Sequence, residues 1–173
     1  MLRLMLLRHA KSSWATPGQP DIERSLSTRG KRAAEAMAET MRERALLPDL
    51  ILCSPARRTR ETLARIQKMI GETCPVEVVD ELYEAAADYR VSIARHGGTA
   101  ATLLVIGHNP VIQATALALA ASGDAEQRRA LARKMPTAAL AVIDFPTMAQ
   151  WAEIASAEGL LETFITPSSL DDD

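Results

Sequence analysis

The segment MLRLMLLRH, residues 1–9, contains the pattern from which the fold class of this chain follows. Residues 2–7 are apolar apart from Arg3, as in a strand that is buried on both faces of a parallel sheet. The run is far shorter than the roughly 20 residues that cross a bilayer as a helix, and no cationic region precedes it. We therefore expect a buried strand that ends at Arg8 and His9.

Other apolar runs alternate with helical patterns along the rest of the chain. We expect further strands at 49–53, 76–79, 102–106 and 138–145, and helices at 27–44, 55–70, 89–95, 109–121 and 125–134. Segment 148–157 fits either a helix or an edge hairpin. The alternation predicts an α/β fold, a three-layer sandwich whose mainly parallel central sheet is flanked by helices.

Composition narrows the possible partners and the compartment. The chain has 173 residues, 47% of them hydrophobic, which suits a single domain at 1–168 followed by a short acidic tail at 169–173. A net charge of -2 with mixed signs favours neither nucleic acid nor a membrane surface as partner. Cys53 and Cys74 fit neither a metal site nor a disulfide framework, so we expect a cytoplasmic protein. Nothing in the sequence indicates its oligomeric state.

Polar clusters follow three of the predicted strands. Arg8 and His9 follow the first strand, SPARR at 54–58 follows the second, and GHNP at 107–110 follows the strand at 102–106. Ligands of open α/β sheets bind beyond the carboxyl ends of the strands, so we expect the three clusters to meet. Arginine forks and helix N-termini both bind phosphate oxygens. Phosphate is therefore the predicted ligand.

Ser54 and Asn109 each precede a proline. This pattern predicts that each residue caps a helix, with the proline at the first helical position, so that two helix N-termini point into the crevice.

Two of the three histidines, His9 and His108, lie in these clusters. Neighbouring arginines disfavour the imidazolium form, which leaves one ring nitrogen free to attack phosphorus. A carbonyl acceptor at the other nitrogen would fix the tautomer. A bond from His9 to phosphorus would divide hydrolysis into two easier transfers.

At these residues the sequence resembles the histidine phosphatase superfamily, also called phosphoglycerate-mutase-like, and within it the small bacterial phosphohistidine phosphatase branch. The resemblance runs nearly end to end and rests on RHAKSSW at 8–14, Asp21 with Arg24, Leu26, Arg29-Gly30, Ser54-Pro55-x-x-Arg58 with Thr62, LYEA at 82–85, and GHNP at 107–110. It implies His9 as nucleophile, a phosphate pocket completed by Arg8, Arg58 and His108, and no metal or cofactor. Ala10 stands where the wider superfamily usually has glycine.

The resemblance leaves the general acid open. Superfamily phosphatases that cleave oxygen esters place a carboxylic acid after the third strand, where this chain has Glu81 and Glu84. Glu84 fits the Leu-x-Glu spacing better. The phosphohistidine branch does not always have this acid, because an imidazole leaves more easily than an alkoxide. Candidate substrate-binding residues around the pocket are Lys11, Ser12, Arg24 and Asn109.

Several conspicuous residues have simpler interpretations. We expect Arg57 to be exposed or paired in a salt bridge, His96 to lie in a surface turn, and Trp14 to pack as a lid. Cys53 is expected to be a small buried residue. The Ala/Leu-rich helix after Pro110 is expected to belong to the core.

The leading functional prediction is hydrolysis of phosphohistidine in a phosphorylated protein. A phosphoglycerate-mutase-like enzyme or a phosphatase for small phosphate esters is the first alternative, although the chain has no spare segment for a mutase lid. A non-catalytic phosphoprotein-binding module is the second alternative. Binding alone would need arginines and amides but no nucleophile such as His9.

Overall fold

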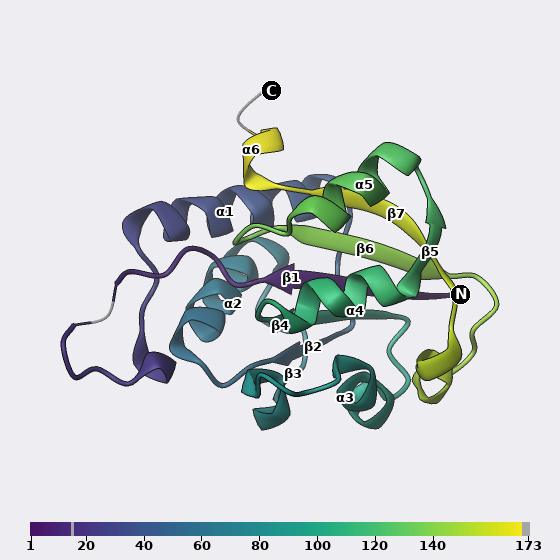
Figure 1. Ribbon diagram of the computed structural model, residues 1–173, viewed down its shortest axis with the longest axis horizontal. Helices are drawn as coiled ribbons and strands as arrows, with labels where there is room; N and C mark the ends of the chain where they lie inside the picture. The colour runs from purple at the N-terminus through teal and green to yellow at the C-terminus, as the bar shows by residue number, and fades with distance from the viewer. Residues whose placement is uncertain (15, 171–173) are drawn as a thin grey trace.

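One mixed sheet in the order β3-β2-β4-β1-β6-β7-β5 forms the centre of the computed structural model, which describes residues 1–14 and 16–170 (Figure 1). Its strands are β1 (Leu2–Arg8), β2 (Leu50–Cys53), β3 (Val76–Val78), β4 (Thr102–Gly107), β5 (Ala120–Gly123), β6 (Leu140–Phe145) and β7 (Gly159–Ile165). The α-helices are α1 (Thr28–Glu43), α2 (Arg57–Ile70), α3 (Tyr89–His96), α4 (Val111–Leu119), α5 (Ala125–Arg133) and α6 (Pro167–Leu170). Short 3-10 helices are η1 (Asp21–Glu23), η2 (Asp80–Tyr83) and η3 (Trp151–Ser156).

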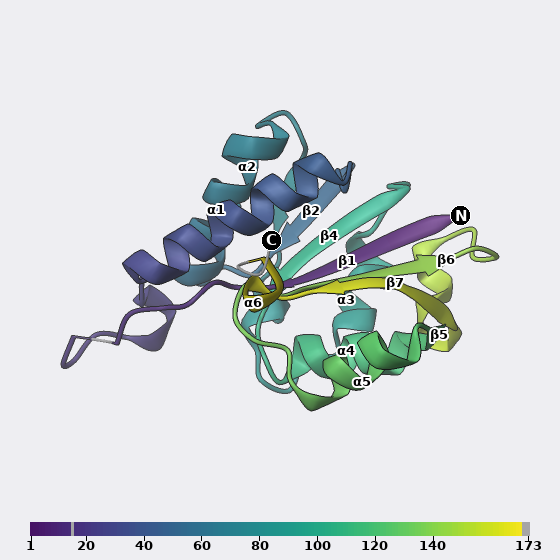
Figure 2. The ribbon, with the colours of Figure 1, turned by 90° about the horizontal axis from the view of Figure 1, so that it is seen from above.

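The central strand β1 divides the core into two layers. It pairs in parallel with β4 and antiparallel with β6. Leu4 and Leu6 join the core beneath α3 and α4, whereas Met5 and Leu7 join the core beneath α1 and α2. Figure 2 shows these two helical layers on opposite sides of the sheet. Burial of each of these side chains contributes roughly 1.5–3 kcal/mol to the free energy of unfolding. The predicted three-layer α/β fold is confirmed.

Arg3 interrupts the apolar run of β1 without disrupting the sheet. Its Nε and Nη2 atoms donate to the two carboxylate oxygens of Asp144 on β6, at 2.7 and 2.8 Å. A bidentate pair of this kind satisfies both charged groups where the two strands lie side by side.

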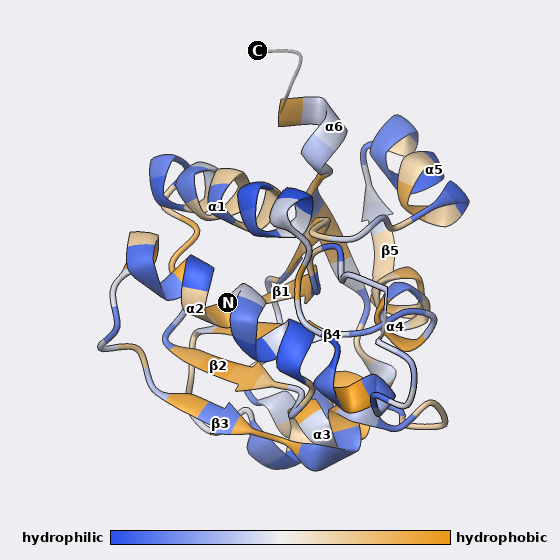
Figure 3. Ribbon diagram, turned by 90° about the vertical axis from the view of Figure 1, so that its left-hand side faces the viewer, coloured by the Kyte–Doolittle hydropathy of each residue, from blue (hydrophilic) through white to orange (hydrophobic). Residues whose placement is uncertain are grey.

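The hydropathy of the elements agrees with their positions. In Figure 3, β2 is coloured as hydrophobic, and α1 alternates between hydrophobic and hydrophilic residues, as an amphipathic helix does. None of the helices in the described residues combines the length and the apolar character that crossing a bilayer requires.

The second half of the chain departs most from the predicted elements. The helix expected to reach residue 121 ends at Leu119, and the next four residues form β5. Strand β7 was not predicted, and segment 148–157 contains η3 rather than a hairpin. Helix α6 crosses the expected boundary between domain and tail at 168, and residues 171–173 lie outside the described residues.

Candidate active site

The three predicted polar clusters meet at the carboxyl ends of β1, β2 and β4. Parallel pairing sets Arg8 beside Gly107 and Cys53 beside Ile106, so the residues that follow these strands share one edge of the sheet. A cavity of about 350 Å³ opens there. Its lining consists of Arg8, His9, Lys11, Ser12, Trp14, Arg24, Arg58, His108, Asn109 and Thr137. The structure thus brings together the four residues predicted for the phosphate pocket.

The ring of His9 is held in one tautomer. Its Nδ1 atom lies 2.7 Å from the carbonyl oxygen of Ala10. Because a carbonyl can only accept, Nδ1 carries the proton and Nε2 keeps its lone pair. The pKa of His9 is lowered to about 3, mainly by burial. The hydrogen bond to Ala10 acts to raise this pKa, whereas the charges of His108, Arg58 and Arg8 lower it further. The imidazole is therefore neutral and nucleophilic near pH 7.

The second imidazole, His108, lies directly beside the first. The ring centroids of His9 and His108 are 5.3 Å apart, and the Nε2 atom of His108 is 2.7 Å from Ser54 Oγ. Burial, followed by the charge of Arg58, lowers the pKa of His108 to about 4. The backbone N–H of His108 donates to Tyr89 Oη at 3.0 Å, which fixes the start of the loop after β4.

The guanidinium of Arg58 is positioned by η1, which lies on a different loop. Nη1 donates to the carbonyl oxygen of Asp21 at 2.9 Å, and Nη2 donates to Asp21 Oδ2 at 3.1 Å. Tyr83 Oη donates to the same Oδ2 atom at 2.8 Å. Burial acts to raise the pKa of Asp21, but the hydrogen bonds from Tyr83 and Arg58 outweigh it and lower that pKa. The carboxylate thus stays charged and holds Arg58 in place.

Arg8 and Asn109 share one anchor in the segment before β6. Arg8 Nη1 and Asn109 Nδ2 each donate to the carbonyl oxygen of Met135 at 3.0 Å. Burial, followed by the charge of Arg58, lowers the pKa of Arg8. Three buried polar atoms of the lining have no hydrogen-bond partner among the described residues: Arg8 Nε, His108 Nδ1 and Asn109 Oδ1. Such groups are suited to bind a polar ligand, because burying them unpaired costs free energy.

Three residues that sequence reasoning did not assign to the site therefore support it. Asp21 and Tyr83 belong to the motifs that carry the family resemblance but were given no role, and Met135 belongs to no motif. Local sequence patterns do not predict these contacts, because each of the three residues reaches the site along a connecting segment rather than from a strand or an α-helix.

The prediction that Ser54 and Asn109 cap helices is wrong. The residues at the N-cap positions of α2 and α4 are Ala56 and Pro110, and neither makes a side-chain capping bond. Helix α2 starts two residues later than the proline pattern indicates, and α4 starts one residue later. Ser54 Oγ instead lies 2.7 Å from His108 Nε2, and Asn109 Nδ2 donates to the carbonyl oxygen of Met135. Both residues therefore support the cavity instead.

The other predicted binding residues form the rim of the cavity. Lys11, Ser12 and Arg24 line it, and Arg24 Nη2 donates to Ser12 Oγ at 2.9 Å. The expectation that Trp14 packs as a lid is wrong, since its side chain is 93% exposed. Its ring lies at the rim with the guanidinium carbon of Arg24 5.8 Å from the ring centroid.

The two candidate acids occupy different surroundings. Glu84 lines a second cavity, of about 640 Å³, whose lining includes Arg58, His108 and Asn109 of the first. Glu81 instead pairs with Arg95 at 3.0 Å. The geometry therefore favours Glu84 over Glu81 as a group near the reacting centre.

Arg57 and His96 both lie outside the candidate site. Arg57 pairs with Glu61 at 2.8 Å on the exposed side of α2, as expected. His96 is the last residue of α3 rather than part of a turn, and it pairs with Glu77 at 2.5 Å. Among the described residues, no three His, Cys, Asp or Glu side chains cluster in a way that could hold a metal ion.

Several known proteins are similar to this chain in sequence and in fold. A model of the histidine phosphatase superfamily (branch 1) matches residues 4–91. An uncharacterized protein of Mycobacterium tuberculosis is 35% identical over 164 residues, which cover 93% of this chain and 99% of the relative. The crystal structure assigned as phosphohistidine phosphatase SixA from Agrobacterium tumefaciens superposes with a TM-score of 0.78 at 31% identity, over 96% of this chain and 98% of that one. A protein histidine phosphatase SixA complexed with tungstate has the same fold, with a TM-score of 0.76, 22% identity, and coverage of 98% and 99%.

Proposed function

This chain belongs to the histidine phosphatase superfamily, and from that premise we propose that it hydrolyses phosphohistidine in proteins through a covalent phosphohistidine on His9. Membership of the family and the likeness to SixA support a phosphatase, which is a hydrolase. The observation that carries the proposal is the pair of neutral imidazoles, 5.3 Å apart, in one cavity with two guanidiniums.

In the first step, Nε2 of His9 attacks phosphorus while the bond from phosphorus to the substrate nitrogen breaks. The leaving imidazole takes up a proton from solvent, and the phosphoryl group is now bonded to His9. The Ala10 carbonyl holds the Nδ1 proton of His9, which keeps the attacking lone pair on Nε2. Arg8, Arg58 and His108 stabilise charge on the equatorial oxygens.

In the second step, a water molecule attacks phosphorus, and the bond to Nε2 of His9 breaks. Inorganic phosphate leaves, a proton of the water is released, and His9 returns to its neutral form. The two guanidiniums supply the positive charge and, together with His108, the hydrogen-bond donors that this reaction needs, so we propose that it proceeds without a metal or a cofactor. Two free cysteines support a cytoplasmic location.

Hydrolysis of small phosphate esters is the second candidate, and the position of Glu84 favours it. Glu84 lines the same cavity as His108, where its carboxyl group could protonate a departing alkoxide. A non-catalytic binding module is less well supported, because binding requires neither the fixed tautomer of His9 nor a free Nε2.

The test measures phosphate release from a histidine-phosphorylated protein and from p-nitrophenyl phosphate, with and without EDTA. We expect release in both conditions and none from His9→Ala, with an acid-labile and base-stable phosphoenzyme. Arg58→Ala should lose activity, whereas its exposed neighbour Arg57→Ala serves as the matched control. In the same assay, Glu84→Gln should slow the ester more than the phosphohistidine protein. Undiminished release by His9→Ala would reject the covalent mechanism.

A further inference from the structure

The outward face of α4 is apolar and open, although the sequence predicted that this helix belongs to the core. Ala114, Leu117 and Ala118 are exposed, Leu117 by 42%, while the inward face of the helix is buried. The sequence of α4, VIQATALAL, contains no charged residue. A solvent-facing helical surface normally carries charged side chains, so this one has the character of a contact surface.

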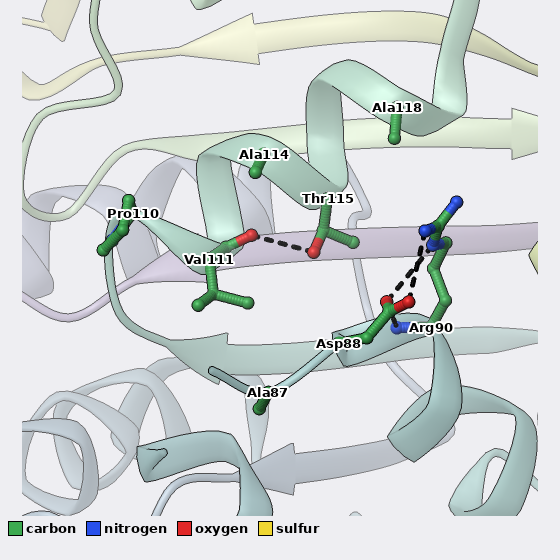
Figure 4. A pocket seen from close by; sticks show the side chains of 8 residues that line it. All are labelled: Ala87, Asp88, Arg90, Pro110, Val111, Ala114, Thr115 and Ala118. Carbon is green, nitrogen blue, oxygen red and sulfur yellow. Dashed lines mark hydrogen bonds and ion pairs between the residues drawn. The ribbon is translucent and has the colours of Figure 1, made fainter. Parts of the chain in front are cut away.

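Hollows lie on both sides of this helical face. A cavity of about 260 Å³ separates α4 from the start of α3, and Figure 4 shows it between Ala114, Ala118 and the segment that carries Asp88. This volume is below the roughly 300–1,000 Å³ of sites that enclose small-molecule ligands, and it suits a side chain inserted by a partner protein. A second hollow, between α4 and α5, is lined by Leu117 and by Arg128 and Arg129, among others.

The 260 Å³ cavity adjoins the candidate active site. Val111, at the start of α4, lines both this cavity and the 640 Å³ cavity that contains Arg58 and His108. Only two residues separate His108 from Val111. A protein whose phosphohistidine enters the catalytic cavity would therefore rest its adjoining surface on α4.

Charge along the edges of the face indicates the chemistry of the partner. Asp88 and Arg90 neutralise each other at 3.1 Å on the α3 side. On the α5 side, Arg128 and Arg129 are exposed and make no ion pair with other described residues. The charged side chains that line the two hollows therefore sum to a positive charge, which complements an acidic flank on the partner.

We propose that the α4 face, defined as Ala114, Leu117 and Ala118 with the two hollows beside them, docks an amphipathic helix of the phosphoprotein substrate. This inference rests on the proposed function and extends it to the class of substrate. The partner's helix presents apolar side chains to the two hollows, and its acidic flank faces Arg128 and Arg129. Binding of an amphipathic helix in an apolar groove is a common mode of recognition between proteins. The catalytic cavity recognises the phosphoryl group, and the α4 face recognises the protein that carries it.

The experiment compares Leu117→Glu with Leu47→Glu. Both leucines are exposed to a similar extent, 42% and 48%, but Leu47 precedes the amino end of β2, away from the catalytic cavity. Each variant is assayed on an intact helical phosphocarrier protein phosphorylated on histidine and on the free amino acid phosphohistidine. Leu117→Glu should lower kcat/KM for the protein about tenfold through KM and leave the free amino acid unchanged. Leu47→Glu should leave both unchanged.

Each other result has a definite meaning. Equal activity of the two variants on the protein overturns docking on α4 but leaves the proposed function intact. If Leu117→Glu loses activity equally on both substrates, the variant has a folding or catalytic defect, and Ala114→Glu decides the question at a second position. Equal loss on both substrates, or no loss, in Ala114→Glu as well overturns docking on α4. If size-exclusion chromatography shows a wild-type dimer that only Leu117→Glu dissociates, the face joins two copies of this chain and the proposal fails. If the wild type releases phosphate from neither substrate, the proposed function is rejected, and the docking proposal is rejected with it.

Discussion

Asp21 connects three side chains around the candidate site. Its backbone carbonyl and carboxylate both accept from Arg58, Tyr83 donates to Oδ2, and Arg24 donates to Oδ1 at 3.3 Å. The residue belongs to η1, so it ties the loop after β1 to helix α2 and to η2. It contacts no reacting atom in the mechanism above and is therefore a positioning residue.

Asp21→Asn should reduce activity without unfolding the protein. The variant keeps the shape and the backbone bond but loses the charge that orients Arg58, and a misplaced catalytic group costs about tenfold to hundredfold in kcat/KM. Glu23→Gln, an exposed carboxylate of the same short helix, should behave as the wild type, and Asp21→Glu should recover part of the loss. Steady-state kinetics with melting curves check this result. Wild-type kinetics in Asp21→Asn would show that Arg58 needs no such support.

The convergence of the four pocket residues could be predicted because it follows from strand pairing. The ends of β1, β2 and β4 lie at the same edge of the sheet, and the pocket residues end a strand, follow it directly, or lie in the first turn of the helix after it. The partners of these residues could not be predicted in the same way. Asp21 and Met135 reach them along loops, and Ser54 bonds a histidine 54 positions away instead of capping its own helix.

At the scale of elements, the strands that build the site were found and those at the far edge were missed. β1, β2 and β4 have apolar runs that identify them, because both of their faces are buried. β5 has the sequence AASG, which lacks the β-branched and aromatic residues that favour strands, and it forms by pairing with β7. β7 carries Glu162 within its apolar run, so neither strand has a strong local signal.

Helix α1 contacts the loop after β1 through a glycine. A Cβ added at Gly30 would lie 2.0 Å from the carbonyl oxygen of Lys11, which is backbone and cannot rotate away. Gly30→Ala should therefore destabilise the protein by about 1–3 kcal/mol, although the same change at an open helical position stabilises by about 1 kcal/mol. Urea unfolding measures the difference, with the exposed Ala36→Gly in the same helix as the reference for propensity. A stabilised Gly30→Ala would contradict the close contact.

The whole molecule should lose stability in mild acid because it buries two neutral imidazoles. The pKa values of His9 and His108 in the folded state, about 3 and about 4, lie below the ordinary 6.5. At pH values between the folded and the unfolded pKa, the unfolded chain binds more protons than the folded protein does. The free energy of unfolding therefore falls as the pH drops below about 6.5, and the full contribution is present above that pH. We expect a loss on the order of 1–4 kcal/mol from pH 7 to pH 5 by urea unfolding. A His9→Gln and His108→Gln double variant should have a flatter profile, and parallel profiles would refute this origin.

The exposure of Trp14 gives the protein a built-in optical probe. The chain has two tryptophans, of which Trp151 is 1% exposed within the core and Trp14 is 93% exposed at the rim of the catalytic cavity. A soluble quencher such as iodide would therefore reach one indole and spare the other. The quenchable part of the emission comes from the indole at the cavity entrance, which an incoming phosphoryl donor must pass. Arrival of the donor can therefore be followed by fluorescence without any attached dye.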